Sequence, residues 1–155
     1  MENDKIIKPN KSVSFNISKT AAYLKFAALN GLKKYNLDDL TLDQYELLYI
    51  LLENDGLYQR QLGRILLKDR PNVTRLVNIL LDKNFVIKRP DLENKKVHRI
   101  YITQKGIDKI SGLAPLKEVM ADKLLSGISE TEIENLLSTL EKIRANLSDD
   151  FTMQT

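Results

Sequence analysis

Cysteine is absent from the 155 residues, and histidine occurs once, at His98. Without cysteine the chain cannot form disulfides, sense redox state through a thiol, or bind zinc or an iron–sulfur cluster through thiolates. A lone imidazole would need neighbouring carboxylates at ligand spacing to hold a metal, and the sequence has no such cluster. We therefore expect neither a metal nor a cofactor, and we expect His98, on a predicted strand, to be packed or solvated.

Long apolar runs are also missing. No stretch approaches the roughly 18 to 20 consecutive apolar residues of a membrane span, and the first residues lack the apolar core of a signal peptide. A hydrophobic content of 43% nevertheless argues against global disorder. The length suits one domain with a sizeable core, or a small head fused to an oligomerisation element, and we expect a cytoplasmic protein.

The patterns typical of enzymes are absent as well. There is no cysteine nucleophile, no glycine-rich phosphate loop and no histidine besides His98. Isolated carboxylates such as Asp43 and Glu46 resemble helix caps or surface charges rather than acid–base pairs. An enzyme is therefore the least favoured class of function.

What the sequence does have is a concentration of positive charge. Residues 55–105 carry 12 Lys and Arg against 5 Asp and Glu, a net charge of +7, whereas the remaining residues carry 12 against 16, a net charge of −4. A basic segment on an acidic scaffold suits the phosphates of a duplex, because Lys and Arg replace its condensed counterions. This pattern predicts a DNA-binding module.

The N-terminal part predicts an arm followed by a long helix. Residues 1–13 are polar and contain Pro9, so we expect a loose arm there. From 14 to 35, apolar residues recur at helical spacings, and the wide face that they form suggests contacts with a partner subunit as well as with the core. The residues of this face are Ile17, Ala21, Leu24, Phe26, Ala28, Leu29, Leu32 and Tyr35.

Two shorter helices are predicted next. Thr41 and Gln44 fit a capping box at the start of a helix over 42–53. Another helix is expected over 58–66, where Gly63 indicates either close helix packing or a tolerated surface position. This helix should direct three apolar residues inward: Leu62, Ile65 and Leu66.

Asp69 and Pro71 mark the start of a further helix that runs to about Lys83. Its buried stripe is predicted to contain Val73, Leu76, Val77 and Leu80. Its outer side is predicted to carry Arg70, Asn72, Thr74, Arg75 and Asn78. Two helices joined by a short turn, the second presenting Arg, Asn and Thr outward, fit a DNA major groove, although a merely solvated face is the alternative for this helix alone.

A hairpin after these helices favours the DNA-binding interpretation. Residues 85–89 and 97–103 are rich in β-branched and aromatic side chains and alternate in polarity, which predicts two strands. Lys95 and Lys96, at the tip between them, could reach a minor groove or the phosphates beside it.

The C-terminal part predicts further helices. Thr103 should cap one that Gly112 and Pro115 kink, since proline removes a helical hydrogen bond. Ser129 and Glu132 form a second capping box, and the helix after it carries an apolar stripe. The stripe contains Ile133, Leu136, Leu137, Leu140, Ile143 and Leu147. With the first helix, this apolar surface exceeds what the head alone needs to cover.

These elements, in this order, resemble the MarR family of bacterial transcriptional regulators over residues 14–148. The matching sequences are Leu40-Thr41, Val73-Thr74-Arg75, Lys83-Asn84-Phe85-Val86 leading to Arg89, and Ile102-Thr103 followed by Gly106. The resemblance implies a mainly α fold with a small β-hairpin wing. A winged helix-turn-helix head would span residues 39–103, with dimerisation helices over 14–38 and 104–150.

The resemblance also implies a homodimer whose recognition helices enter successive major grooves of a pseudo-palindromic duplex. Such a protein would be a repressor that a small aromatic or anionic ligand releases from DNA. Because Arg pairs with guanine and Asn with adenine, the predicted major-groove residues are Arg70, Asn72 and Thr74. The predicted phosphate contacts are Gln59, Arg60, Arg64 and Arg75, and the predicted wing contacts are Lys95 and Lys96. The predicted dimerisation residues are Ile17, Leu24, Ile133, Leu136, Leu137, Leu140 and Ile143.

Two positions depart from the family pattern. An Asp-Arg-Arg type sequence usually occupies the wing where this chain has Asn94-Lys95-Lys96. Asn94 cannot form the ion pair that typically stiffens the wing, so we expect a looser and less selective wing. Gly63 stands where alanine is usual, so the first helix of the motif should be less rigid. A weakly selective architectural DNA-binding or protein-interaction winged helix therefore remains an alternative.

The effector has no recognisable motif. Five aromatic residues are candidates for a ligand pocket between the head and the dimerisation helices: Tyr23, Phe26, Tyr45, Tyr49 and Tyr101. Aromatic residues at helical spacing serve the core more often than a ligand, so both interpretations stay open.

Overall fold

The computed structural model describes residues 12–148, which fall into two compact units divided after Asp38. The described part of the first unit is one long helix, α1 (Val13–Lys34), capped by the Ser12 hydroxyl, which accepts from the backbone N–H of Phe15 at 3.4 Å. The helix thus begins one residue before its predicted start. The predicted arm lies outside the described residues, except for Ser12 and Val13, which belong to the helix start.

Most of the apolar face of α1 is exposed. Its exposed large apolar residues are Val13, Phe15, Ile17, Tyr23, Leu24, Phe26 and Leu29. The sequence predicted that this face was too wide for one set of contacts, and within the single chain it is largely uncovered.

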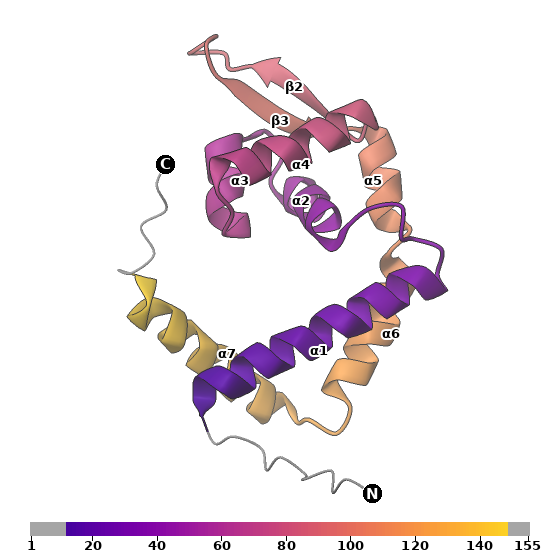
Figure 1. Cartoon of the computed structure of the whole chain (residues 1–155), viewed down its shortest axis with the longest axis vertical. Coiled ribbons are helices and arrows are strands. Elements are labelled where there is room, and N and C mark those ends of the chain that lie inside the picture. The colour runs from indigo at the N-terminus through magenta and orange to yellow at the C-terminus, as the bar shows by residue number, and fades with distance from the viewer. Residues whose placement is uncertain (1–11, 149–155) are drawn as a thin grey trace, which may run out of the picture. The chain divides into compact units, whose positions relative to one another are not determined.

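The second unit begins with the three helices of a helix-turn-helix head (Figure 1). They are α2 (Leu42–Glu53), α3 (Gln59–Leu66) and α4 (Arg70–Asp82). The predicted capping box at Thr41 and Gln44 is confirmed, and so is the cap at Asp69, whose carboxylate accepts from the backbone N–H of Asn72 at 2.8 Å. Helices α2 and α4 therefore begin where a side chain accepts from a free N–H group of the first turn, whereas α3 has no such side-chain cap.

The core of the head surrounds α2, which contacts α3, α4, α5 and β3. Its fully buried side chains come from several elements: Leu47, Leu48, Leu51, Leu62, Val73, Val77, Leu80, Val86 and Ile100. The predicted buried stripe of α4 is confirmed at all four positions. Gly63 is buried, which favours close packing over a surface position, whereas Ile65 is 52% exposed and does not point inward as predicted.

A three-stranded antiparallel sheet follows, in the order β1-β3-β2. The predicted hairpin is formed by β2 (Val86–Pro90) and β3 (His98–Ile102), in a register that pairs Lys88 with Ile100. The first strand, β1 (Leu57–Tyr58), has two residues and pairs with Ile100 and Arg99. No sequence pattern predicted it, because a strand of this length has no period of its own.

The C-terminal part consists of α5 (Gln104–Ser111), α6 (Ala114–Leu125) and α7 (Glu130–Asn146). The predicted kinked helix is in fact two helices, because the chain breaks at Gly112 and Leu113 and restarts with Pro115 in the first turn of α6. Thr103 caps α5 as predicted. A Cβ on Gly106 would collide with the Phe85 carbonyl oxygen, so only glycine fits this close approach of α5 to the residue that precedes β2.

Helix α7 begins at the predicted capping box, in which the Ser129 hydroxyl and the Glu132 carboxylate each accept from the other residue's backbone N–H. None of its residues is buried. Among the described residues, no helix is both long and apolar enough to cross a membrane.

Candidate nucleic-acid interface

A basic groove of about 730 Å³ lies between α3, the turn before α4 and the hairpin. Its walls come from the α3 region (Tyr58, Gln59, Arg60, Gln61, Gly63, Arg64), the turn (Lys68, Asp69, Arg70) and the hairpin (Lys88, Lys96, Val97, His98). The lining thus contains six Lys and Arg side chains and one carboxylate, that of Asp69. This balance suits a polyanion, because cations on several elements surround a single groove.

The polar side of α4 is organised by hydrogen bonds to its neighbours. The Asn72 side-chain amide donates to the Asp69 carboxylate at 3.0 Å, which leaves its second amide hydrogen and its oxygen for a base edge. The Thr74 hydroxyl is half-buried and donates to the Gln59 side chain at 3.0 Å, joining α4 to α3. Arg70 and Arg75 are exposed. Helix α4 therefore presents Arg and Asn outward, with Thr74 turned toward α3.

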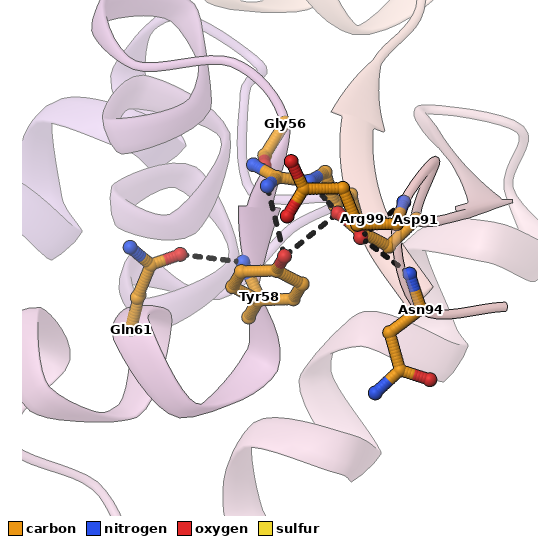
Figure 2. A network of polar contacts seen from close by, with 7 residues as sticks. Gly56, Tyr58, Gln61, Asp91, Asn94 and Arg99 are labelled. Carbon is orange, nitrogen blue, oxygen red and sulfur yellow. Dashed lines mark hydrogen bonds and ion pairs between the residues drawn. The ribbon is translucent and has the colours of Figure 1, made fainter. Parts of the chain in front are cut away.

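The base of the wing is held by a buried carboxylate, Asp91, which follows β2 and is 5% exposed (Figure 2). Its Oδ2 accepts from the Tyr58 hydroxyl at 2.7 Å and from Nε of Arg99 at 2.5 Å. Its Oδ1 accepts from the backbone N–H groups of Glu93 and Asn94, both at 3.0 Å. One carboxylate therefore links the wing turn to β1 and β3.

Arg99 completes this cluster, which we call the Tyr58–Asp91–Arg99 cluster. Its guanidinium donates to the Tyr58 hydroxyl at 2.8 Å and to the Gly56 carbonyl at 3.1 Å, and it lies 4.4 Å from the centre of the Tyr58 ring. The expectation of a looser and less selective wing rested on the ion pair that Asn94 cannot form, and it stays a prediction. Asn94 indeed forms none, but Asp91 and Arg99 supply a pair from other positions of the same hairpin.

The electrostatics of the cluster favour its charged form. Hydrogen bonds from Tyr58, from Arg99 and from the backbone of Asn94 hold the pKa of the Asp91 carboxyl well below its usual range. Tyr58 and Arg99 each donate their own hydrogen bond to Asp91, and these bonds raise the pKa of the Tyr58 hydroxyl and the pKa of the Arg99 guanidinium. The cluster therefore keeps one negative and one positive charge at neutral pH.

Several predicted interface residues line the groove together: Gln59, Arg60, Arg64, Arg70 and Lys96. Asn72, Thr74 and Arg75 lie farther along α4, and Lys95 lies at the wing tip, outside the groove lining. No sequence pattern had indicated a role in this groove for three further lining residues: Lys68, Lys88 and His98. Alternation places Lys88 and His98 on the same strand faces as Val86 and Ile100, which are buried, so the pattern could not show where the core ends and the groove begins.

The candidate pocket aromatics are spread over several elements. Tyr45 is buried on α2, and Tyr49, half-buried on the same helix, lies beneath the Lys117 ammonium, 3.5 Å from the ring centre. The Arg89 guanidinium lies over the ring of Tyr101, on β3, at 5.4 Å from the ring centre. Tyr23 and Phe26 are exposed on α1, in the other unit. A shared pocket for these residues stays a prediction.

The predicted dimerisation residues lie on exposed or half-exposed faces. On α1, Ile17 and Leu24 are exposed, and on α7, Leu136 and Leu137 are exposed. The remaining three, Ile133, Leu140 and Ile143, are half-buried. Residues 12–148 contain no group of three or more His, Asp or Glu side chains that could hold a metal ion.

The MarR family profile matches residues 40–98, which include the groove. The uncharacterized HTH-type transcriptional regulator YybA of Bacillus subtilis (strain 168) is 32% identical over 113 residues, covering 73% of this chain and 75% of that protein. The crystal structure of the transcriptional regulator SlyA has a TM-score of 0.78 at 28% identity and covers 90% of this chain and 96% of its own.

The fold is also that of MepR of S. aureus in complex with DNA, with a TM-score of 0.77 at 24% identity, over 89% of this chain and all (100%) of MepR. The profile, the sequence identity and the fold thus agree with one another and with the order of elements in the head. The chain belongs to the MarR family of winged helix-turn-helix transcriptional regulators, a family of regulators rather than enzymes.

Proposed function

We propose that this regulator is a homodimeric, sequence-specific DNA-binding protein that represses transcription and is released from its operator by a small ligand. The observation that carries the DNA-binding part is the groove, where six cations from α3, the following turn and the wing face one carboxylate. DNA is the polyanion in question because α4 presents Arg and Asn side chains on the helix that follows the turn.

Base recognition falls to the start of α4. Arg70 pairs with guanine through its two parallel donors, and Asn72 uses its free amide hydrogen and oxygen on adenine. Thr74, bonded to Gln59, contributes at the edge of this surface. Arg60, Arg64 and Arg75 bind phosphates, which set the register of the helix without carrying sequence information.

The wing supplies Lys95 and Lys96 to the neighbouring backbone or minor groove. Lys96 lines the same groove as Arg60 and Arg64, which supports a shared path for one strand of the duplex. Lys68, Lys88 and His98 extend this path between α3 and the hairpin.

Dimerisation is supported by the apolar residues that the single chain leaves exposed. Such residues stand on α1 at Ile17 and Leu24 and on α7 at Leu136 and Leu137. Exposed apolar patches on this scale mark interaction surfaces in soluble proteins. A symmetric pair of copies would place two recognition helices on half-sites about one duplex turn apart. A cytoplasmic location forms part of this proposal, since the operator lies there.

Ligand release is supported by aromatic residues with cations over their rings. Tyr49 beneath Lys117 offers an aromatic acid both a ring face and a positive charge. A thermal-shift screen of small aromatic carboxylic acids and dyes, followed by measurement of DNA release, tests this part. An inducer must bind the free protein more tightly than the DNA-bound one, so a compound that raises Tm and leaves operator affinity unchanged is not an inducer.

Selection of duplexes from a random pool by the purified full-length protein tests DNA recognition itself. We expect a pseudo-palindrome with half-sites about one turn apart to be recovered. Binding without enrichment of any sequence would instead support an architectural protein, and failure to bind duplexes in dilute buffer would contradict the proposal.

A further inference from the structure

The wing is joined to the start of α3 through the Tyr58–Asp91–Arg99 cluster. Tyr58 immediately precedes α3, and its backbone N–H donates to the Gln61 side chain at 2.9 Å, within the first turn of that helix (Figure 2). The hydroxyl of the same residue donates to Asp91, at the base of the wing. One residue thus connects the helix that carries Arg60 and Arg64 to the turn that carries Lys96.

A second set of hydrogen bonds continues from Asp91 to Lys96. The Asp91 carboxylate accepts from the Asn94 N–H, and the Asn94 side-chain oxygen accepts from the Lys96 N–H at 3.1 Å. The turn is closed by backbone bonds from Val97 N–H to Asn94 at 3.0 Å and from Asp91 N–H to Val97 at 3.0 Å. The backbone of Lys96 is therefore fixed, step by step, to a carboxylate that is itself fixed to α3.

We propose that Asp91 is a positioning residue for DNA binding, which holds the wing turn so that Lys96 meets the same duplex backbone as the cations of α3. The proposal rests on the proposed DNA-binding function and adds the residue that places the wing. It assigns to positions 58, 91 and 99 the stiffening that the family usually obtains from the wing sequence, where this chain has Asn94.

The sign of the expected effect separates positioning from simple charge. Asp91 is negative and buried, so it cannot contact DNA, and its removal lowers the negative charge near a polyanion. Charge alone therefore predicts that Asp91→Asn tightens binding to every duplex. Positioning predicts that the same substitution weakens binding, because Lys96 loses its place.

The experiment measures duplex affinity over a range of salt concentrations for Asp91→Asn, Lys96→Ala and the double variant. The probes are the duplex recovered by selection and a random-sequence duplex. We expect Asp91→Asn to weaken binding to the selected duplex about fivefold or more. A loss of this size is within the range of the interaction energies between residues of one hydrogen-bonded network. Lys96→Ala should flatten the salt dependence by about one unit in the wild type and by much less in the Asp91→Asn background.

Two matched controls distinguish positioning from general destabilisation. Arg64 lies on α3, so Arg64→Ala should weaken binding by the same factor with or without Asp91→Asn. Asp39 forms an ion pair with Lys109 at 2.6 Å, away from the groove lining, so Asp39→Asn should leave duplex affinity unchanged. Thermal unfolding of each variant shows that the measurements are made on folded protein.

Tighter or unchanged binding by Asp91→Asn, or a Lys96→Ala effect of equal size in both backgrounds, would overturn the proposal. Should Asp91→Asn not fold, Tyr58→Phe removes two hydrogen bonds of the cluster, the one to Asp91 and the one from Arg99, and keeps the ring beneath Arg99. It should show the same coupling to Lys96→Ala, more weakly, and its absence would be equally decisive. If the wild type binds no duplex, the proposed function fails, whereas normal wild-type binding with no coupling rejects the positioning role alone.

Discussion

The head and the terminal helices differ in how far they bury their apolar residues. In the head, side chains such as Leu47, Leu62 and Val77 are fully buried within one chain. On α7 no residue is buried, although the helix carries Leu136 and Leu137, and most of the apolar face of α1 is exposed. The head has therefore completed its core, whereas the terminal helices leave much of their apolar surface exposed within one chain, as the proposed dimer would require.

Polar groups differ between the same two regions. In the head they connect elements far apart in the sequence, as when Asp91 joins Tyr58 and Arg99. On α7 they are local, as in the capping box of Ser129 and Glu132. Long-range bonds fix the relative positions of the groove residues, while local bonds fix only where a helix begins. The head is thus built for a defined interface with DNA, and α7 for packing.

The largest expected effect comes from charging the exposed stripe of α7. Leu137→Glu should convert the dimer to a monomer and weaken operator affinity about 100-fold or more, because the second half-site no longer binds as part of one molecule. Sedimentation measures the oligomeric state, and duplex titration measures the operator affinity. Ser138→Glu, one residue along the same helix, is the control and should alter neither. A dimer that survives Leu137→Glu would place the interface elsewhere.

A buried leucine of the head should affect stability instead. Leu47→Ala should lower the free energy of unfolding by about 2–5 kcal/mol, since it removes buried methyl groups and leaves a cavity. Operator affinity should be unchanged well below Tm. Exposed Leu136→Ala should shift Tm by an amount that depends on protein concentration. Denaturant titration measures the first effect and thermal unfolding at two protein concentrations measures the second. Equal behaviour of the two variants would abolish the contrast between the regions.

Within the groove, Arg70 and Lys96 should separate base recognition from phosphate binding. Arg70→Ala should cost about 1–3 kcal/mol on the selected duplex and relax the preference at one base position. Lys96→Ala should weaken selected and random duplexes alike. Competition binding with both duplexes measures the difference. The assignment is rejected by equal losses of specificity in the two variants.

The lowered pKa of Asp91 predicts how stability depends on pH. The stabilisation of the folded state is complete above the unfolded pKa of about 4 and is lost as pH falls through the lower folded pKa, because protonation removes the charge that Tyr58 and Arg99 bind. The gap in denaturant midpoint between wild type and Asp91→Asn should be constant near neutrality and shrink in acid. A gap that keeps its full neutral-pH size down to about pH 2 would contradict this.

The smallest effect is expected at the start of α7. Ser129→Ala removes the hydroxyl of the capping box and should cost about 1 kcal/mol of stability. Ser138→Ala, inside the same helix, serves as the control, because that serine caps nothing. A cost as large as that of Leu47→Ala would mean that the stability of α7 depends more on its cap than on packing against a second copy of the chain.

Local patterns were enough to predict most elements of this fold. The caps at Thr41, Asp69, Thr103 and Ser129 are side chains that act on N–H groups three residues away, so the sequence places them directly. The buried stripe of α4 follows from its helical period. The break between α5 and α6 was expected as a kink, since sequence shows that proline interrupts a helix and does not show how far the chain turns.

Long-range contacts were not predictable in the same way. The pairing of Leu57 and Tyr58 with β3, and the bonds of Asp91 to residues 58 and 99, join positions without a shared period. The expectation of a looser wing did not include the ion pair of Asp91 with Arg99, because only the folded hairpin brings these two positions together. Sequence indicated a basic interface, and the structure shows that Lys68, Lys88 and His98 also line the basic groove.

The mass of the complex with the selected duplex tests the central claim most directly. Analytical ultracentrifugation of the full chain, alone and with that duplex in dilute buffer, should show a dimer at micromolar concentration and two chains on each duplex. A chain that stays monomeric under these conditions, or leaves the duplex unbound, would contradict the account.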